Sequence, residues 1–190
     1  MAAARLGATV RIVVRVGQDS FGPTLLRDLR AHGVDTEKIA EDPDNPLGVT
    51  IILLDSQHQN YIIAAYGANA ACDGDQVEAA DPLLLQLEIP FEASLQTAQQ
   101  ARSKGVAVVW GPAPARELPL DLYESVDLFM TNQVEATALT GVKVTDVPSA
   151  RSASDVLRSG GVPVVVVKLG GDGAFYTSPQ AAAAMHRPTT

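Results

Sequence analysis

Apolar residues recur along the first third of the chain in a strand spacing and then in a helix spacing. Positions 10–16 alternate apolar and polar residues, which predicts a strand. After a turn at 17–20, three leucines within 25–29 share one helical face, and Gly33 ends that helix. The chain therefore opens with a strand–helix unit.

Two apolar, β-branched runs come next, at 47–54 and 60–66, with the polar stretch 55–59 between them. Such a pair predicts a β-hairpin, here over about 46–67.

From residue 83 onward, strands and helices alternate. The expected strands are 83–87, 106–110, 126–130, 164–169 and 174–177, and the expected helices are 93–104, 133–140 and 149–159, with a short one near Asp121. This alternation predicts an α/β fold, with a mostly parallel sheet covered by helices and ligands beyond the carboxyl ends of the strands. The alanine run at 181–184 is interpreted as a frayed end.

The composition supports one globular domain over 1–190, with 46% hydrophobic and 19% charged residues. The net charge of −8 disfavours nucleic acid as a partner, because an acidic chain repels phosphates. No run approaches the roughly 18 apolar residues of a membrane span. The single cysteine, Cys72, is compatible with a reducing, cytoplasmic compartment. Three arginines and no acid in the first 16 residues also fit a mitochondrial presequence, but the alternation of Val10, Ile12, Val14 and Val16 is better explained as a strand.

Several common signatures are missing from the sequence: a Walker A loop, a complete G-x-G-x-x-G and a His-Glu-x-x-His. The histidines fall at a helix end, a hairpin turn and the tail, which gives no support to a shared metal site.

The segment 131–135 follows an expected strand and opens a helix. Asn132 is an expected N-cap, the free N–H groups beyond it can bind phosphate, and Glu135 can hold a hydrated Mg²⁺. The same pair also forms an ordinary capping box, and local sequence alone favours that interpretation.

The glycine-rich turn 168–173 ends a buried strand, and its backbone N–H groups can approach a phosphate or nucleobase closely. A plain Asp-Gly hairpin turn is at least as good an interpretation of this turn alone. In the segment 86–90, Glu88 follows an apolar strand, where it can accept hydrogen bonds from a polyol or be a solvated strand end.

Taken in order, these pieces resemble the ribokinase group of the PfkB carbohydrate kinase family. The resemblance is carried by AARLGA at 3–8, VGQDSFG at 16–22, GVDT at 33–36, PLG at 46–48, GAN at 67–69, QLEIP at 86–90, PAPARELP at 112–119, NQVEATALTG at 132–141 and KLGGDG at 168–173. Each block alone is weak, whereas their succession across nearly the whole chain is specific.

The resemblance implies a ribokinase-like three-layer (Rossmann-like) fold with a small β lid, here the hairpin, which in this family also supplies the dimer contact. It implies ATP-dependent phosphorylation of D-ribose to ribose 5-phosphate in the cytoplasm, with ATP and Mg²⁺ as cofactors. The implied site residues are Glu88 in the sugar pocket, Asn132 at the phosphates, Glu135 at Mg²⁺ through water, and Lys168, Gly170 and Gly173 along the nucleotide.

The sequence also departs from the family pattern. The family's GGKGAN segment and its GAGD segment, which carries the catalytic aspartate, are absent from 1–190, so the fold is expected to be incomplete at both ends and no residue is assigned as catalytic. The family's monovalent-cation site falls in the same missing part. Gly111 stands where ribokinases usually have Asn, and Lys168 where Thr is frequent.

These observations favour a ribokinase-like enzyme whose 190 residues are a truncated piece, inactive alone. A non-catalytic module that binds a sugar or associates with a kinase is the alternative, and a nucleotide-binding regulatory domain is a weaker one.

Overall fold

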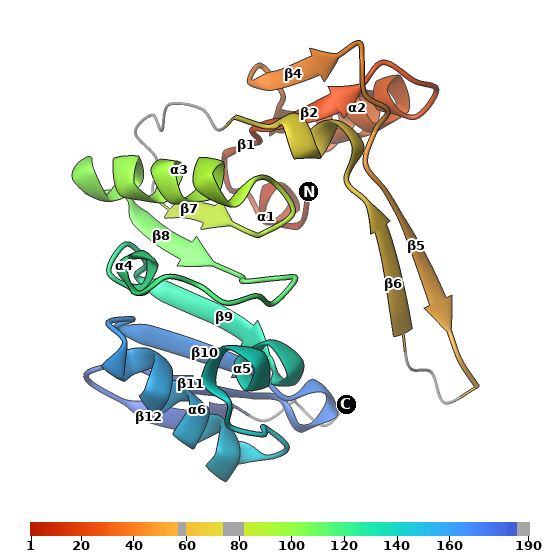
Figure 1. Cartoon of the computed structure of the whole chain (residues 1–190). Helices are drawn as coiled ribbons and strands as arrows, with labels where there is room; N and C mark the ends of the chain where they lie inside the picture. The colour runs from red at the N-terminus through yellow and green to blue at the C-terminus, as the bar shows by residue number, and fades with distance from the viewer. Residues whose placement is uncertain (57–59, 74–81, 186–190) are drawn as a thin grey trace. The chain divides into compact units, whose positions relative to one another are not determined.

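The computed structural model describes residues 1–56, 60–73 and 82–185. The chain divides into two compact units (Figure 1). Unit 1 comprises Met1–Asp75 with Glu88–Ala93, and unit 2 comprises Gln76–Leu87 with Ser94–Thr190. That all 190 residues form one partial domain remains a prediction.

Unit 1 consists of short strands and helices followed by a hairpin. Its elements are α1 (Ala2–Arg5), β1 (Val10–Arg11), β2 (Val14–Gly17), α2 (Gly22–Ala31), β3 (Val34–Asp35), β4 (Ile39–Asp42), β5 (Val49–Leu54), β6 (Asn60–Ala65) and the 3₁₀ helix η1 (Gly67–Ala71).

The prediction of one continuous strand over 10–16 is wrong, because the structure has two short strands there. The strand breaks after β1, which pairs in parallel with β3, and resumes as β2, which pairs in parallel with β4. From Arg11↔Asp35 to Val14↔Ile39 the partner segment is one residue longer than the 10–16 segment, so the two pairings are out of step and the strand is interrupted at 12–13. The predicted helix is confirmed: Leu26 and Leu29 of α2 are buried, and Gly33 follows with a φ of 73°.

The predicted hairpin is confirmed as β5 and β6, with Ile51 opposite Ile63 and Ile52 opposite Ile62. Both of its faces are exposed; all six residues of β5 are exposed, and Ile52 and Ile62 expose 60% and 61% of their surface. Since an isolated two-stranded hairpin is marginally stable in water, such faces need cover.

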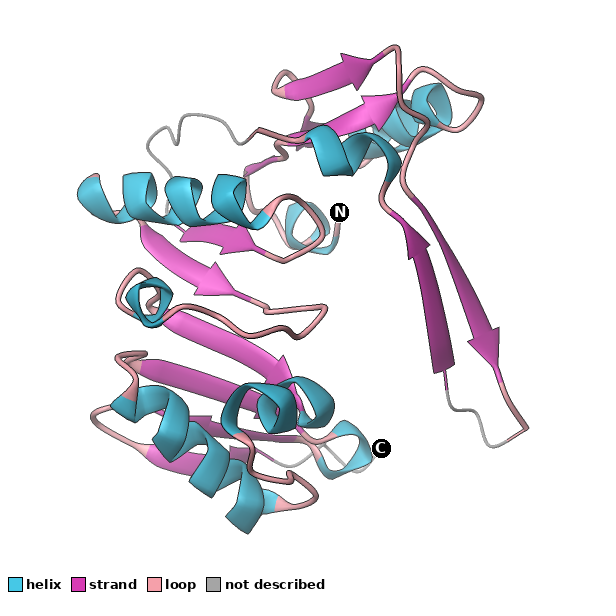
Figure 2. Cartoon of the chain, viewed as in Figure 1, coloured by secondary structure: helices cyan, strands magenta, loops and turns pink. Residues whose placement is uncertain are grey.

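Unit 2 is a six-stranded mixed sheet with helices (Figures 1 and 2). The strands are β7 (Pro82–Leu85), β8 (Ala107–Trp110), β9 (Leu128–Asn132), β10 (Val164–Lys168), β11 (Ala174–Thr177) and β12 (Ala182–Met185), in the order β12-β11-β10-β9-β8-β7. The helical segments are α3 (Phe91–Ser103), whose first residues cluster with unit 1, α4 (Leu120–Tyr123), α5 (Gln133–Thr140), α6 (Val147–Ser159) and the 3₁₀ turn η2 (Gly170–Asp172).

The strands β7 to β10 run parallel, and β11 and β12 are antiparallel additions. This arrangement confirms the predicted α/β class and the mostly parallel sheet. None of the described helices has the length and apolar character needed to cross a bilayer.

One face of the sheet forms the core of unit 2. Trp110, Phe129 and Val165 are fully buried on adjacent strands, and Phe129 meets the ring of Tyr123 edge-on at a centroid distance of 5.5 Å. Positions on the opposite face are less covered, and Met130 remains 39% exposed. The alternation along each strand is therefore that of a sheet whose described neighbours cover mainly one face.

The interpretation of residues 181–184 as a frayed end is wrong. Residues Ala182–Met185 form β12, paired antiparallel with β11 from Ala174↔Met185 to Thr177↔Ala182. Alanine has low strand propensity, so backbone pairing with β11 decides the conformation here.

Candidate functional site

Asn132 ends β9 and caps α5. Its side-chain oxygen accepts a hydrogen bond from the backbone N–H of Glu135 at 2.8 Å, and its own backbone N–H donates to Glu135 Oε2 at 2.8 Å. Its amide Nδ2 donates to Glu135 Oε1, also at 2.8 Å. The predicted capping box is confirmed, and Gly141 ends the helix in the left-handed region with a φ of 72°.

The capping box does not use all of the hydrogen-bond acceptor sites of the Glu135 carboxylate. Each of its oxygens accepts one hydrogen bond from Asn132, whereas a carboxylate offers about four acceptor sites. Glu135 is half-buried at the start of an eight-residue helix, where the helix dipole favours anions. The carboxylate is thus oriented by Asn132 and retains acceptor capacity for metal-bound water.

Lys168 ends the neighbouring strand β10 and is exposed. In the parallel register, Lys168 is the Cα partner of Asn132. The carboxyl ends of β9 and β10 therefore bring together a lysine, the capping box and the start of α5. A cation beside a helix N-terminus is an arrangement that suits phosphate.

The glycine-rich turn 170–173 begins two residues after Lys168 and leads into β11. Gly170 has a φ of 62° and Gly173 a φ of 90°, values that favour glycine, and a Cβ on Gly170 would meet no atom within 4 Å. Leu169 N–H donates to Gly173 O at 2.7 Å, so the turn also closes the antiparallel β10–β11 pair. The hairpin-turn interpretation is confirmed as local structure, and the exposed glycine backbone remains accessible to a ligand.

Glu88 is exposed and lies three residues beyond the end of β7. It clusters with unit 1, whereas Asn132, Glu135, Lys168 and the glycine turn belong to unit 2. Within unit 2 the structure therefore brings the residues of the predicted nucleotide side together, and Glu88 belongs to the other unit.

Gly111, the departure at the end of β8, lies on the same edge of the unit 2 sheet. Its N–H donates to Leu85 O at 2.9 Å, and a Cβ would lie no closer than 3.7 Å to any neighbouring heavy atom. A side chain would fit here, so the absence of the usual Asn is not imposed by packing.

Within the described residues, no group of three or more His, Cys, Asp or Glu side chains could hold a metal ion. His32 contacts Arg5 and the backbone oxygen of Asp28, whereas His58 and His186 lie outside the described residues. A metal held by Glu135 alone would have to keep most of its waters, as Mg²⁺ commonly does.

Comparison with known proteins gives the class. Residues 1–190 match the pfkB family of carbohydrate kinases, and the chain belongs to this family. It is 36% identical over 184 residues to the ribokinase of Haemophilus influenzae, covering 93% of this chain and 60% of that protein.

The particular likeness is to ribokinases. The mouse (Mus musculus) ribokinase is 34% identical over 195 residues, covering 98% of this chain and 60% of that protein. The structure of Arabidopsis thaliana ribokinase complexed with ribose and ATP superposes with a TM-score of 0.85 at 26% identity, covering 97% of this chain and 63% of that one. This chain thus spans about 60% of the length of those curated relatives, and the resemblance to the ribokinase group and its fold is confirmed.

Proposed function

We propose that this chain is the lid-bearing and nucleotide-binding part of a sugar kinase that transfers the γ-phosphoryl group of ATP to the primary hydroxyl of D-ribose. The observation that carries the proposal is the register that pairs Lys168 with Asn132 at the carboxyl edge of the sheet. Relatives named ribokinase that match over nearly the whole chain support the choice of sugar.

In this proposal the strand-end residues bind the nucleotide. Lys168 contacts a phosphate, Asn132 orders the start of α5 and orients Glu135, and the backbone of Gly170 and Gly173 approaches the nucleotide. Glu135 holds magnesium through water, and the bound ion neutralises charge on the transferring phosphate.

Glu88 and the hairpin β5–β6 form the sugar side. An exposed carboxylate beyond a strand accepts hydrogen bonds from sugar hydroxyls, and an apolar hairpin over a sugar excludes water during transfer. We place this enzyme in the cytoplasm, where ATP is abundant.

The 190-residue polypeptide is proposed to have no turnover by itself. The attacking hydroxyl must lose its proton as the bond from Pγ to the leaving ADP oxygen breaks, and no base for that proton is assigned within 1–190. Loss of a general base and of preorganised donors each lowers the rate by about 10²- to 10⁴-fold.

Titration calorimetry of the purified chain with Mg·ATP tests the nucleotide side. Lys168→Ala should weaken binding about tenfold or more, because a hydrogen bond to a charged group contributes about 1.5–3 kcal/mol. Lys143→Ala, which removes an exposed lysine elsewhere in unit 2, is the matched control. Equal affinity in all three proteins would overturn the assignment.

Titration with ribose tests the sugar side in the same way. Glu88→Gln should weaken ribose binding, whereas Glu92→Gln, an exposed carboxylate in the first turn of α3, should not. Comparing ribose with 2-deoxyribose in the native chain then distinguishes the two sugars.

The alternative is a non-catalytic module that binds ribose or associates with a complete kinase subunit. Ribose binding together with co-purification of a full-length ribokinase, and no ADP formation added by the chain, would support this alternative.

The hairpin is also the proposed dimer contact. Both faces are apolar, so one can cover the sugar while the other packs on the hairpin of a second copy; the exposed residues are Val49, Ile51, Ile52, Leu53, Leu54, Tyr61, Ile62 and Ile63. Light scattering should find a dimer that Ile52→Glu converts to monomer, with Ile51→Glu as the test of the opposite face. A monomeric native chain would contradict the contact.

A further inference from the structure

The entry to the hairpin is held by a side chain far away in the sequence. Asp19 Oδ2 accepts a hydrogen bond from the backbone N–H of Leu47 at 2.7 Å, two residues before β5. Its Oδ1 accepts from the N–H groups of Phe21 and Gly22, at 2.9 and 3.1 Å, at the start of α2. One carboxylate therefore ties the hairpin entry to the beginning of a helix.

The backbone at the entry lies directly against β2. A Cβ on Gly17 would overlap Leu47 N and Pro46 C, so only glycine permits this approach. On the other side, a Cβ on Gly67 would overlap Pro46 O, and Ala68 N–H donates to that same oxygen at 2.8 Å. The entry is thus packed between the end of β2 and the segment that leaves β6.

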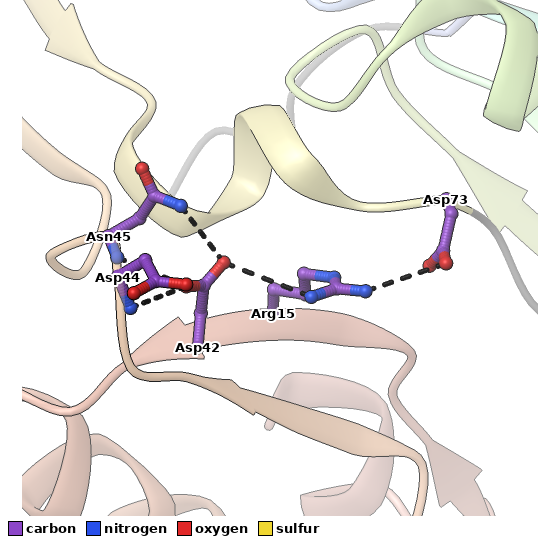
Figure 3. Close-up of polar contacts among 5 residues, drawn as sticks. All are labelled: Arg15, Asp42, Asp44, Asn45 and Asp73. Carbon is purple, nitrogen blue, oxygen red and sulfur yellow. Dashed lines mark hydrogen bonds and ion pairs between the residues drawn. The ribbon is translucent and has the colours of Figure 1, made fainter.

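A second carboxylate holds the turn before the entry (Figure 3). Asp42 Oδ1 accepts from the N–H groups of Asp44 and Asn45 at 2.9 and 3.0 Å, and Oδ2 accepts from Asn45 Nδ2 at 3.1 Å. The side chain of Asp42 is only 5% exposed, whereas residues 43–46 of the turn are exposed, so a buried carboxylate holds an exposed turn.

Arg15 links the entry to the exit. Its guanidinium lies 3.8 Å from Asp42 Oδ2 and 3.4 Å from Asp73 Oδ2, beyond η1 (Figure 3). The contact with Asp73 is weak, since that side chain is 79% exposed. Arg15 Nε is nevertheless buried without a hydrogen-bond partner among the described residues, so the guanidinium is held in place by packing as well.

Arg15 and Gly17 are two residues apart in β2 and so lie on one side of the strand, and Asp19 lies in the bend that follows it. We propose that Arg15, Gly17 and Asp19 form a seat that fixes both ends of the hairpin β5–β6, and that Asp19 is the positioning residue that sets how the hairpin leaves the rest of unit 1. If the hairpin moves, it then pivots where it joins the seat, at the Gly48–Val49 bond before β5 and at the Ala65–Tyr66 bond after β6.

The bearing of this seat on sugar binding rests on the proposed function, in which the hairpin covers ribose. An apolar hairpin that is free to swing covers a sugar for a smaller fraction of the time, and the apparent affinity falls by that fraction. The attachment of the hairpin is a property of the chain whether or not ribose binds.

Amide hydrogen exchange followed by NMR tests the seat in the full 190-residue chain. Asp19→Asn keeps one acceptor oxygen but replaces the other with an NH₂ group, so it cannot accept from Leu47 and from the start of α2 together. Exchange at Leu47 and Ala68 should become at least tenfold faster, while Ile63 within the hairpin and Val165 within unit 2 should be unchanged. Asp28→Asn, an exposed carboxylate on α2, is the charge-matched control.

The exchange rates at Leu47 and Ala68 decide between a local seat and a general stabilising role for Asp19. Unchanged exchange at Leu47 in Asp19→Asn would overturn the seat, and so would uniformly faster exchange throughout unit 1, because that identifies a general stabiliser. If Asp19→Asn does not fold, Arg15→Lys serves instead: faster exchange at Ala68 with Ile63 unchanged supports the seat, and no change at Ala68 contradicts it. Ribose titration of Asp19→Asn is separate, since a native chain that binds no ribose defeats the proposed function and leaves the exchange result standing.

Discussion

Replacement of Asn132 by Ala is the sharpest test of the strand-end site. The substitution removes two of the three hydrogen bonds that Asn132 makes with Glu135, the cap to the Glu135 N–H and the Nδ2 bond to Oε1. Losing an N-cap costs about 0.5–2 kcal/mol, and losing a hydrogen bond to a carboxylate costs about 1.5–3 kcal/mol, or less where, as here, the carboxylate is only half-buried. Because both bonds involve the same residue pair, the two losses do not simply add, and we expect a total of about 1–3 kcal/mol.

Urea denaturation followed by tryptophan fluorescence measures this loss in unit 2 alone. Trp110 is the only tryptophan of the chain and is fully buried there. With a urea dependence of about 2 kcal/mol per molar, the midpoint should fall by about 0.5–1.5 M. Asn132→Ser keeps a cap oxygen without the amide donor and should recover roughly half of that shift.

The second capping box in unit 2 is the control. Asp146 accepts from the Ser149 N–H at the start of α6, so Asp146→Ala should lower the midpoint as well but leave Mg·ATP affinity unchanged. Asn132→Ala should lower both. An unchanged midpoint in Asn132→Ala would refute the stability argument, and equal nucleotide affinity in both variants would refute the placement of the site.

The remaining predictions concern the stability effects of two glycine substitutions, of low pH and of a truncation in the core. Gly17→Ala should destabilise unit 1 severely because its Cβ overlaps backbone, whereas Gly111→Ala, with no contact nearer than 3.7 Å, should be tolerated in a thermal melt. Hydrogen bonds, chiefly from Leu47 N–H and the Asn45 side chain respectively, hold the pKa of Asp19 and Asp42 below the ordinary 3.8. Between the lowered pKa values and the ordinary one, the unfolded chain binds more protons than the folded chain, so the stability that Asp19 and Asp42 contribute is present above about pH 4 and is lost as the pH falls through the lowered values. The loss should appear as smaller protection factors at Leu47 and Ala68, that is, as exchange rates that rise relative to the intrinsic rates at the same pH. Phe129→Ala should cost about 3–5 kcal/mol in the same urea assay, and a smaller loss would mean that the core relaxes around the gap.

The sequence predicts the sheet of unit 2 well because its signals are local. Runs such as 164–168 are apolar, β-branched and bounded by turn residues, so periodicity and composition agree. The strand β12 has neither signal, because a run of alanines shows no alternation of apolar and polar residues and has no β-branched side chain. It forms because its backbone pairs with the edge of β11. The break between β1 and β2 likewise depends on which strands they pair with, which no local window contains.

The same distinction applies to the functional residues. Asn132 and Glu135 are three residues apart, so their relation is written in the local sequence and was predicted. Asp19 and Leu47 are 28 residues apart, and the sequence indicates only a turn at 17–20. A single sequence carries no signal for such a contact, because an aspartate before a helix is fully explained by the helix.

The capping role and the proposed magnesium role of Glu135 use the same side-chain geometry. A carboxylate that holds a metal-bound water must point in a fixed direction, and the two N–H groups of Asn132 provide that direction while the box caps α5. The two roles still differ in what they require of the side chain, because the cap needs an acceptor and a magnesium site needs negative charge. Glu135→Gln keeps an acceptor for Asn132, so a role limited to capping leaves Mg·ATP affinity unchanged, whereas a role in holding magnesium lowers that affinity more than the urea midpoint accounts for.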